Sequence, residues 1–126
     1  MTESDYCTGG CHCGRVRYRV RFQGRVLLDC NCSICQKKGI LHGFVDPDSF
    51  ELISGREALT TYTFNTHVAK HRFCSTCGVQ CFYRPRSHPD QIDVNARTLD
   101  GFDSEEWDIR PFDGQNWEAN VESIRK

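Results

Sequence analysis

Cysteine is the residue type in this chain that offers chemistry, because nine of its 126 residues are cysteines. Seven of them fall in three short motifs, CHCG, CNCSIC and CSTCG, and occupy positions Cys11, Cys13, Cys30, Cys32, Cys35, Cys74 and Cys77. A cysteine thiolate serves as a metal ligand or as a nucleophile. The C-x-C and C-x-x-C spacings favour a bound metal ion over a disulfide bridge.

The number of cysteines and the start of the chain also argue against a disulfide framework. An odd number of cysteines cannot pair completely within one chain. The first ten residues, MTESDYCTGG, have neither the basic region nor the apolar region of a secretory signal. We therefore expect a cytoplasmic location, with the nucleus as the alternative, and both compartments disfavour structural disulfides.

Glycine follows two of the three cysteine motifs. It occupies positions 14 and 78, directly after CHC and CSTC, whereas CNCSIC is followed by Gln36. A glycine at such a position permits a positive φ, so that backbone N–H groups can point at the sulfur atoms. We therefore expect the two glycine-terminated pairs to form one structural zinc site with four thiolate ligands. Its ligands would be Cys11, Cys13, Cys74 and Cys77. The alternatives are free thiols and two separate sites.

The motif CNCSIC then leaves Cys30, Cys32 and Cys35 for a second site. A catalytic zinc typically has three protein ligands and one open position. Two cysteines at the end of a strand, followed by a third one helical turn later, suit such an open site. Two other interpretations remain, a thiol cluster without metal and a site closed by a fourth ligand. The candidates for that ligand are Cys7, Cys81, His42, His67 and His71.

The elements that position these motifs are mainly strands. In RVRYRVRF, at residues 15–22, apolar residues alternate with four arginines, which predicts a strand with one buried face. We interpret the arginines as a solvated face in preference to a basic binding patch. Further strands are expected at residues 24–30, 50–55, 59–64, 71–74, 79–84 and 91–97.

Helical structure is expected in two short segments. One is a turn at residues 33–38, and the other is a helix near the C-terminus that Asn116 would cap and that carries Trp117, Val121 and Ile124 on one face. The sequence thus predicts a mainly β fold, a small zinc-bound antiparallel β-sheet domain with one or two short helices. We expect residues 1–126 to form this single domain.

The charge of the chain gives no reason to expect a polyanionic partner. The net charge is −1 and the isoelectric point is about 6.5. Neither nucleic acid nor an anionic membrane is therefore expected as a partner. The longest apolar runs, such as VLL at 26–28, are too short to span a bilayer. An exposed strand edge would allow a homodimer.

Taken in order, CHCG, CNCSIC, FCSTCGVQCFYRPRS and VNARTLDG resemble the glutathione-dependent formaldehyde-activating enzyme family over residues 11–117. The segment TTYTFNTH before HRFC is similar to the centromere protein V branch of that family. The resemblance implies antiparallel sheets packed like a tent (a β-tent) around two zinc ions per chain. It implies a structural zinc on Cys11, Cys13, Cys74 and Cys77, and a catalytic zinc with an open position on Cys30, Cys32 and Cys35. This second zinc would be either permanent or labile, leaving when substrate binds.

The family's reaction adds the thiol of glutathione to formaldehyde and gives S-hydroxymethylglutathione. The resemblance therefore implies a zinc-dependent carbon–sulfur lyase or synthase that acts on glutathione adducts of small aldehydes. Zinc stabilises a thiolate at neutral pH, or it polarises a carbonyl as a Lewis acid. Three thiolate ligands would weaken the Lewis acid, so we expect delivery or capture of the thiol.

Glutathione carries carboxylates, so its site should offer cations or N–H donors. The best candidates are Arg84, Arg86 and Ser87 in YRPRS, which matches the family pattern, followed by Lys37 next to CNCSIC. Either His67 or His71 would serve as an acid or base or as a hydrogen-bond donor. For each of these residues the alternative is an ordinary surface or packed side chain.

Two other functions compete with the enzyme. Centromere protein V suggests a non-enzymatic module on chromatin or microtubules, but that association is linked to a basic, proline-rich N-terminal extension. The ten residues before Cys11 have no such character, which favours the enzyme. The third possibility is a zinc-binding chaperone or redox sensor that uses the thiols of CNCSIC.

Overall fold

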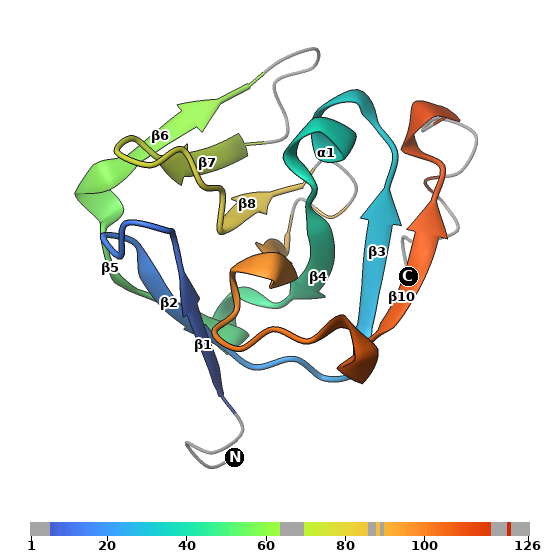
Figure 1. Cartoon of the computed structure of the whole chain (residues 1–126), viewed down its shortest axis with the longest axis horizontal. Helices are drawn as coiled ribbons and strands as arrows, with labels where there is room; N and C mark the ends of the chain where they lie inside the picture. Colours follow the sequence, from blue (N-terminus) through green and yellow to red (C-terminus); the bar gives the residue numbers. More distant parts are fainter. Residues whose placement is uncertain (1–5, 64–69, 86–87, 89, 117–120, 122–126) are drawn as a thin grey trace.

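The computed structural model describes residues 6–63, 70–85, 88, 90–116 and 121. These residues form two β-sheets, one of three strands and one of seven, with a single short α-helix, α1 (Ser33–Lys38), above the larger sheet (Figure 1). Within this part of the chain, no helix has the length and apolar character needed to cross a membrane. The mainly β fold predicted from the sequence is confirmed.

The three-stranded sheet has the order β1-β2-β5, with the bounds Cys7–Gly10, Arg17–Val20 and Phe50–Ser54. The seven-stranded sheet has the order β10-β3-β4-β9-β8-β7-β6. Its strands, in that order, are Asp108–Phe112, Val26–Cys30, Leu41–Val45, Ile92–Asn95, Phe82–Arg84, Lys70–Cys74 and Leu59–Tyr62. Short 3-10 helices connect them: η2 (Pro47–Ser49), η3 (Arg56–Ala58), η4 (Ala96–Thr98), η5 (Ser104–Glu106) and η6 (Gly114–Asn116).

The pairing of β10 with β3 is parallel, whereas the other strand pairs of the described residues are antiparallel. Neither this strand nor its direction was predicted from the sequence. Proline removes one backbone donor and is tolerated mainly at a sheet edge, and Pro111 lies in β10, the edge strand. The helix expected around Trp117 and Ile124 lies largely outside the described residues.

The strand expected at 15–22 is present in its central part, as β2. Val16, Tyr18 and Val20 are fully buried, as the alternation predicted. On the other face, Arg17 pairs with Asp100 and Arg19 pairs with Glu51. These arginines therefore balance nearby carboxylates, which agrees with a solvated face.

Strand register gives the larger sheet two different faces, because residues paired across strands point to the same side. One face is apolar and carries Leu27, Leu41, Val45, Phe82 and Val94. It packs on the smaller sheet through aromatic contacts, with the ring of Phe50 lying 4.7 Å from Phe82 and 5.5 Å from Tyr18. Burying each such side chain contributes roughly 1.5–3 kcal/mol, so this face holds the two sheets together.

The opposite face of the larger sheet is buried but polar. A row of cross-strand neighbours runs over four adjacent strands: Phe44 in β4 pairs with Asp93 in β9, Asp93 with Tyr83 in β8, and Tyr83 with His71 in β7. His42 lies two residues before Phe44 and therefore points to the same side. His42, His71 and Asp93 are at most 3% exposed, so this polar row is covered and needs internal partners.

Candidate metal centres

The first cysteine cluster joins the two sheets. Cys11 and Cys13 lie between β1 and β2, Cys74 ends β7, and Cys77 follows in the next turn. Their four sulfur atoms all lie within 4.8 Å of one another, and the sulfur of Cys13 is 3.6 Å from that of Cys11 and 3.7 Å from that of Cys74. The structure thus brings together the four residues that the sequence assigned to the structural zinc.

Backbone geometry around this cluster follows the glycine argument. The φ angles of Gly14 and Gly78 are 84° and 80°, in the region that favours glycine. The N–H of Val16 donates to the sulfur of Cys11 at 3.3 Å. The N–H of Cys77 likewise lowers the pKa of the Cys74 thiol. Such N–H donors stabilise thiolates, the form in which cysteine binds a metal.

The second cluster sits where β3 turns into α1. Cys30 is the last residue of β3, Cys32 is the N-cap of α1, and Cys35 is buried one turn later. The sulfur of Cys32 accepts a hydrogen bond from the N–H of Cys35 at 3.4 Å. The helical turn predicted at 33–38 is therefore present, and it ends at Gly39 with a φ of 67°.

The three thiols of this cluster share their protons. Hydrogen bonds from Cys30 and Cys35 hold the pKa of Cys32 well below its ordinary value. The hydrogen bond with Cys32 raises the pKa of Cys30 to about 11. Hydrogen bonds with Cys30 and Cys32 raise the pKa of Cys35 still further. Cys32 is therefore the thiol of this cluster that most readily becomes a thiolate, the form in which cysteine binds a metal.

A histidine completes the geometry. A ring nitrogen of His42 and the sulfur atoms of Cys30 and Cys35 form a trio whose atoms all lie within 4.8 Å of one another. Cys32 is not part of this trio. Of the five candidates for a fourth ligand, His42 is thus the one that belongs to the cluster. Cys7, Cys81 and His71 do not belong to it, and His67 lies outside the described residues.

The ring of His42 is held from one side. Its Nδ1 atom forms a very short hydrogen bond with Oδ2 of Asp93, and the hydroxyl of Tyr83 lies 3.3 Å from the same nitrogen. Burial alone would lower the pKa of His42, but the Asp93 carboxylate outweighs burial and raises it. Within the described residues, the buried Nε2 atom has no hydrogen-bond partner.

A chain of hydrogen bonds leads from Lys38 in α1 to His71, a member of the polar row on the larger sheet. Nζ of Lys38 donates to Oε1 of Gln80 at 2.5 Å, and Nε2 of Gln80 lies 3.2 Å from Nδ1 of His71. The ring of His71 stacks on Tyr83 at 4.4 Å. Burial, aided by Lys38, lowers the pKa of His71 to about 4, so this histidine is neutral at physiological pH.

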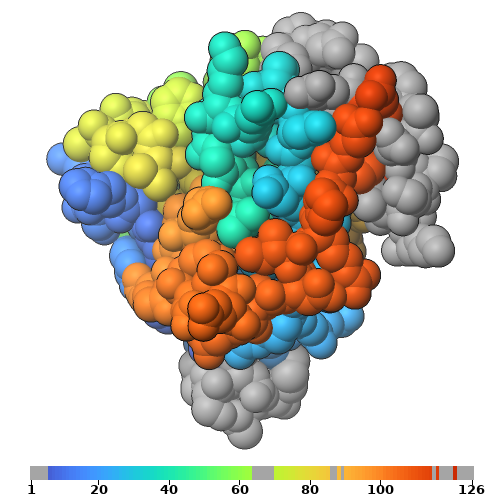
Figure 2. Space-filling view, turned by 45° about the vertical axis from the view of Figure 1, so that its right-hand side comes forward, coloured from blue at the N-terminus to red at the C-terminus, as the bar shows by residue number. Residues whose placement is uncertain are grey.

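The segment after β10 covers the second cluster from the other side. The N–H of Asn31 donates to the carbonyl of Phe112 at 3.2 Å, which fixes the chain beside CNCSIC. The next turn begins at Gly114, where a Cβ atom would overlap the sulfur of Cys30 and lie 2.9 Å from Cβ of Cys32. Figure 2 shows α1 (teal), β3 (light blue) and β10 (orange-red) next to one another on this face.

The residues predicted to bind substrate are less closely tied to this cluster. Arg84 is exposed at the end of β8, and alternation places its side chain on the face opposite Tyr83. Lys37 is exposed in the last turn of α1. Arg86 and Ser87 lie outside the described residues. The role of all four in substrate binding remains a prediction.

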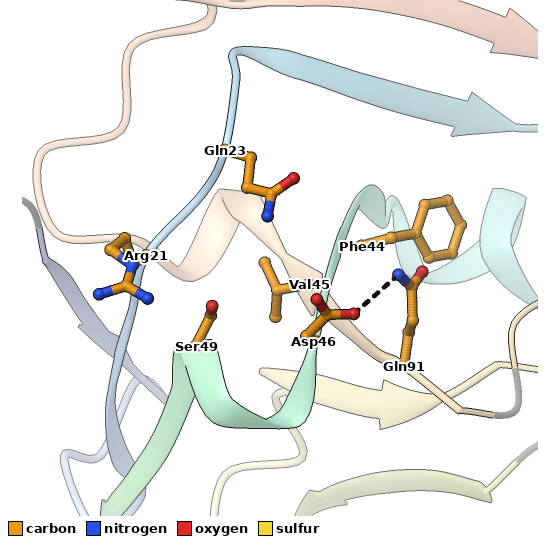
Figure 3. Close-up of a pocket in the computed structure, with 7 residues that line it drawn as sticks. All are labelled: Arg21, Gln23, Phe44, Val45, Asp46, Ser49 and Gln91. Carbon is orange, nitrogen blue, oxygen red and sulfur yellow. Dashed lines mark hydrogen bonds between the residues drawn. The ribbon is translucent and has the colours of Figure 1, made fainter. Parts of the chain in front are cut away.

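A small hollow lies away from the thiols, at the end of β4 (Figure 3). Its lining residues are Arg21, Gln23, Phe44, Val45, Asp46, Ser49 and Gln91. A hydrogen bond of 3.3 Å from Gln91 to Asp46 crosses one side of it. The lining contains no cysteine or histidine, so the hollow offers no reactive group of the kind found in the clusters.

Sequence reasoning missed Asp93, Tyr83, Gln80 and Gly114 as parts of the second centre. The alternation in QIDVNAR marked Ile92 and Val94 as a buried face and gave no sign that Asp93 is buried too. A signal was nevertheless present, because an acidic residue inside a strand between two apolar ones is unusual unless it is paired.

The fold and its clusters define a small, mainly β protein with two cysteine-rich centres of the kind that hold metal ions. The chain belongs to the glutathione-dependent formaldehyde-activating enzyme family, whose model matches residues 6–117. It is also similar to a Rhodobacter sphaeroides protein of known crystal structure, with 33% sequence identity and a TM-score of 0.75. That similarity covers 82% of this chain and 97% of the other. Membership of the family implies an enzyme activity that involves glutathione and formaldehyde.

Proposed function

We propose that this protein is a zinc-dependent carbon–sulfur lyase or synthase that forms or cleaves S-hydroxymethylglutathione or a related glutathione adduct of a small aldehyde. The observation that supports this function best is the geometry of the second cluster, in which the turn from β3 into α1 gathers three thiols and the buried imidazole of His42 lies beside two of them. A cluster that served only to cross-link the fold would not need the row of buried polar side chains, His42, Asp93 and His71, next to it.

Two zinc ions per chain fit the residues present. Cys11, Cys13, Cys74 and Cys77 would hold the structural ion. From the family resemblance, Cys30, Cys32 and Cys35 would hold the second, and Cys30 and Cys35 lie in one candidate metal group. Soft sulfur donors suit zinc, and the close packing of Gly114 on Cys30 and Cys32 keeps these two thiols in place. The chemistry that zinc supplies in such a site is the stabilisation of a thiolate at neutral pH.

In the reaction itself, the sulfur of glutathione forms a bond to the carbonyl carbon of the aldehyde. The thiol proton is lost, and the carbonyl oxygen gains one to become a hydroxyl group. The reverse reaction breaks the same carbon–sulfur bond and returns the proton to sulfur. No oxidant or reductant is needed.

The chain's own side chains would orient the substrate and limit access of water. Lys37 and Lys38 lie in the last turn of α1, the helix that carries Cys35, and offer cations for the carboxylates of glutathione. Tyr83 and His42 form a buried wall of the site. From the family resemblance, Arg84, Arg86 and Ser87 would bind the more distant parts of glutathione.

The test is the rate at which formaldehyde and glutathione interconvert with their adduct, measured by exchange NMR against the uncatalysed reaction. The wild-type protein should accelerate this exchange, and Cys32→Ser should lose that acceleration while the fold persists. Cys7→Ser is the control, because Cys7 belongs to neither cluster of the described residues. If the wild type accelerates no glutathione–aldehyde exchange, the proposed function is wrong.

A non-enzymatic zinc module, like the one suggested by centromere protein V, is the alternative. Its binding to chromatin or microtubules would require a basic surface. Here the net charge is −1, and Arg17 and Arg19 are paired with carboxylates. These observations favour the enzyme, and a zinc-loaded but inactive wild type would support the module instead.

A further inference from the structure

Two buried side-chain atoms of the second centre, Nε2 of His42 and Oδ1 of Asp93, have no hydrogen-bond partner among the described residues. Nε2 of His42 has no such partner although the residue is only 3% exposed. More than nine in ten buried polar groups have a partner, so an exception points to a missing ligand, water or ion. A ring nitrogen of this residue lies within 4.8 Å of the sulfur atoms of Cys30 and Cys35.

We propose that His42 is a ligand of the second zinc, which it binds through Nε2 beside the sulfur atoms of Cys30 and Cys35. The inference rests on the proposed function only in that it needs the second zinc site. It adds a nitrogen ligand to a site that cysteine spacing alone describes as three sulfurs.

The partners of the other ring nitrogen support this role. A histidine that binds a metal almost always donates its second N–H to a carboxylate or carbonyl, which fixes the tautomer and the direction of the ring. Nδ1 of His42 contacts the carboxylate of Asp93, with the hydroxyl of Tyr83 at 3.3 Å. With the proton on Nδ1, the lone pair is on Nε2, the atom that lacks a partner.

The burial of Asp93 points the same way. Its side chain is fully buried, and a buried carboxylate is costly unless a positive charge compensates it. A metal ion on the far side of the His42 ring would supply that charge through the imidazole. The strand register fixes this arrangement, since Asp93 and His42 lie on the same face of neighbouring strands.

The ligand set then has an order. Cys30, Cys35 and His42 already lie close together, whereas Cys32 stands outside this trio. A catalytic zinc commonly has three protein ligands and one exchangeable position. With Cys30, Cys35 and His42 as these three ligands, Cys32 is the cysteine of the motif that contributes least to holding the ion.

The experiment compares metal binding in four forms of the full chain: wild type, His42→Asn, Asp93→Asn and His71→Asn. Asparagine at position 42 keeps an N–H that can donate to Asp93 but has no atom in the place of Nε2. His71→Asn is the matched control, a buried histidine of the same polar row outside the trio. Zinc is counted by native mass spectrometry, and its affinity is measured by competition with a chelator.

We expect His42→Asn to retain one zinc and to lose affinity for the second by roughly 100-fold or more, since loss of an outer partner alone costs roughly 10- to 100-fold. Asp93→Asn should fall in that smaller range, and His71→Asn should bind both ions with wild-type affinity. Unchanged zinc affinity in a folded His42→Asn variant would overturn the inference.

A measurement on the wild type covers the case in which His42→Asn does not fold. Co²⁺ is placed in the weaker site, with zinc kept in the other, and the proton NMR spectrum is recorded in H₂O and in D₂O. A coordinated imidazole gives a strongly shifted N–H signal that disappears in D₂O, and cysteine ligands have no such proton. Absence of that signal would show that no histidine binds the ion.

The two proposals fail separately. If His42→Asn loses the second zinc but the wild type accelerates no glutathione–aldehyde exchange, the ligand assignment stands and the proposed function falls. If the wild type is active and His42→Asn keeps both ions, the ligand assignment falls and the enzyme remains.

Discussion

The α-carbon of Gly114 packs directly against the sulfur of Cys30, so that a Cβ atom at this position would overlap that sulfur. The contact joins two parts of the chain that parallel pairing of β10 and β3 brings together. This contact leaves the second cysteine cluster no room to move toward Gly114. Gly114 therefore acts on the cluster through its lack of a side chain.

Gly114→Ala should displace Cys30 and weaken the second metal site. Overpacking of this kind costs about 1–3 kcal/mol in unfolding free energy. Urea unfolding and a zinc count by native mass spectrometry measure the two effects. Gly24→Ala is the control, because a Cβ atom there would meet nothing within 4 Å, and we expect its stability to match the wild type. Two tightly bound zinc ions in a fully stable Gly114→Ala variant would contradict this view of the packing.

Cys77→Ser should unfold the protein or cause it to aggregate. The first cluster connects the turn after β7 to the β1–β2 connection, and a structural zinc contributes its binding free energy to folding. Circular dichroism and thermal unfolding provide the measurement, with Cys7→Ser as the control. A Cys77→Ser protein with wild-type thermal stability would show that the four thiols are not one structural site.

The parts of the site predicted from the sequence are those encoded locally. The C-x-C and C-x-x-C motifs, the glycines at 14 and 78, and the helical turn after Cys32 each depend on a few neighbouring residues. The alternation around Tyr18 likewise depends only on the period of a strand.

The parts that the sequence did not show depend on long-range pairing. Asp93 meets His42 across 51 positions of sequence, and only the register of β4 with β9 places them together. Gly114 lies against Cys30 because β10 pairs in parallel with β3. Strand β10 contains Pro111, and a proline is not expected within a strand, so the sequence did not predict it. Among five candidate ligands, spacing could not single out His42, whereas the sheet register does.

The three cysteines of CNCSIC should differ in how strongly they hold the second zinc. Cys30 and Cys35 belong to the trio with His42, whereas Cys32 does not. Cys30→Ser and Cys35→Ser should therefore lose more zinc affinity than Cys32→Ser. Chelator competition on the three variants tests this order, with the first zinc as an internal reference. An equal loss in all three variants would instead indicate a symmetric three-sulfur site.

His71 should make stability depend on pH over a defined range. Burial first, and then Lys38 and His42, lower its pKa from 6.5 to about 4, while the nearby Cys32 acts in the opposite direction. Because the unfolded chain binds this proton more readily, the stabilising contribution is complete above pH 6.5 and is lost as the pH falls toward about 4. His71→Gln cannot take up the proton, so its stability should fall less over the same interval, by on the order of 1 kcal/mol. Urea unfolding of both proteins in excess zinc measures the difference. If the stability gap between them stays constant across this range, His71 is not a buried neutral histidine.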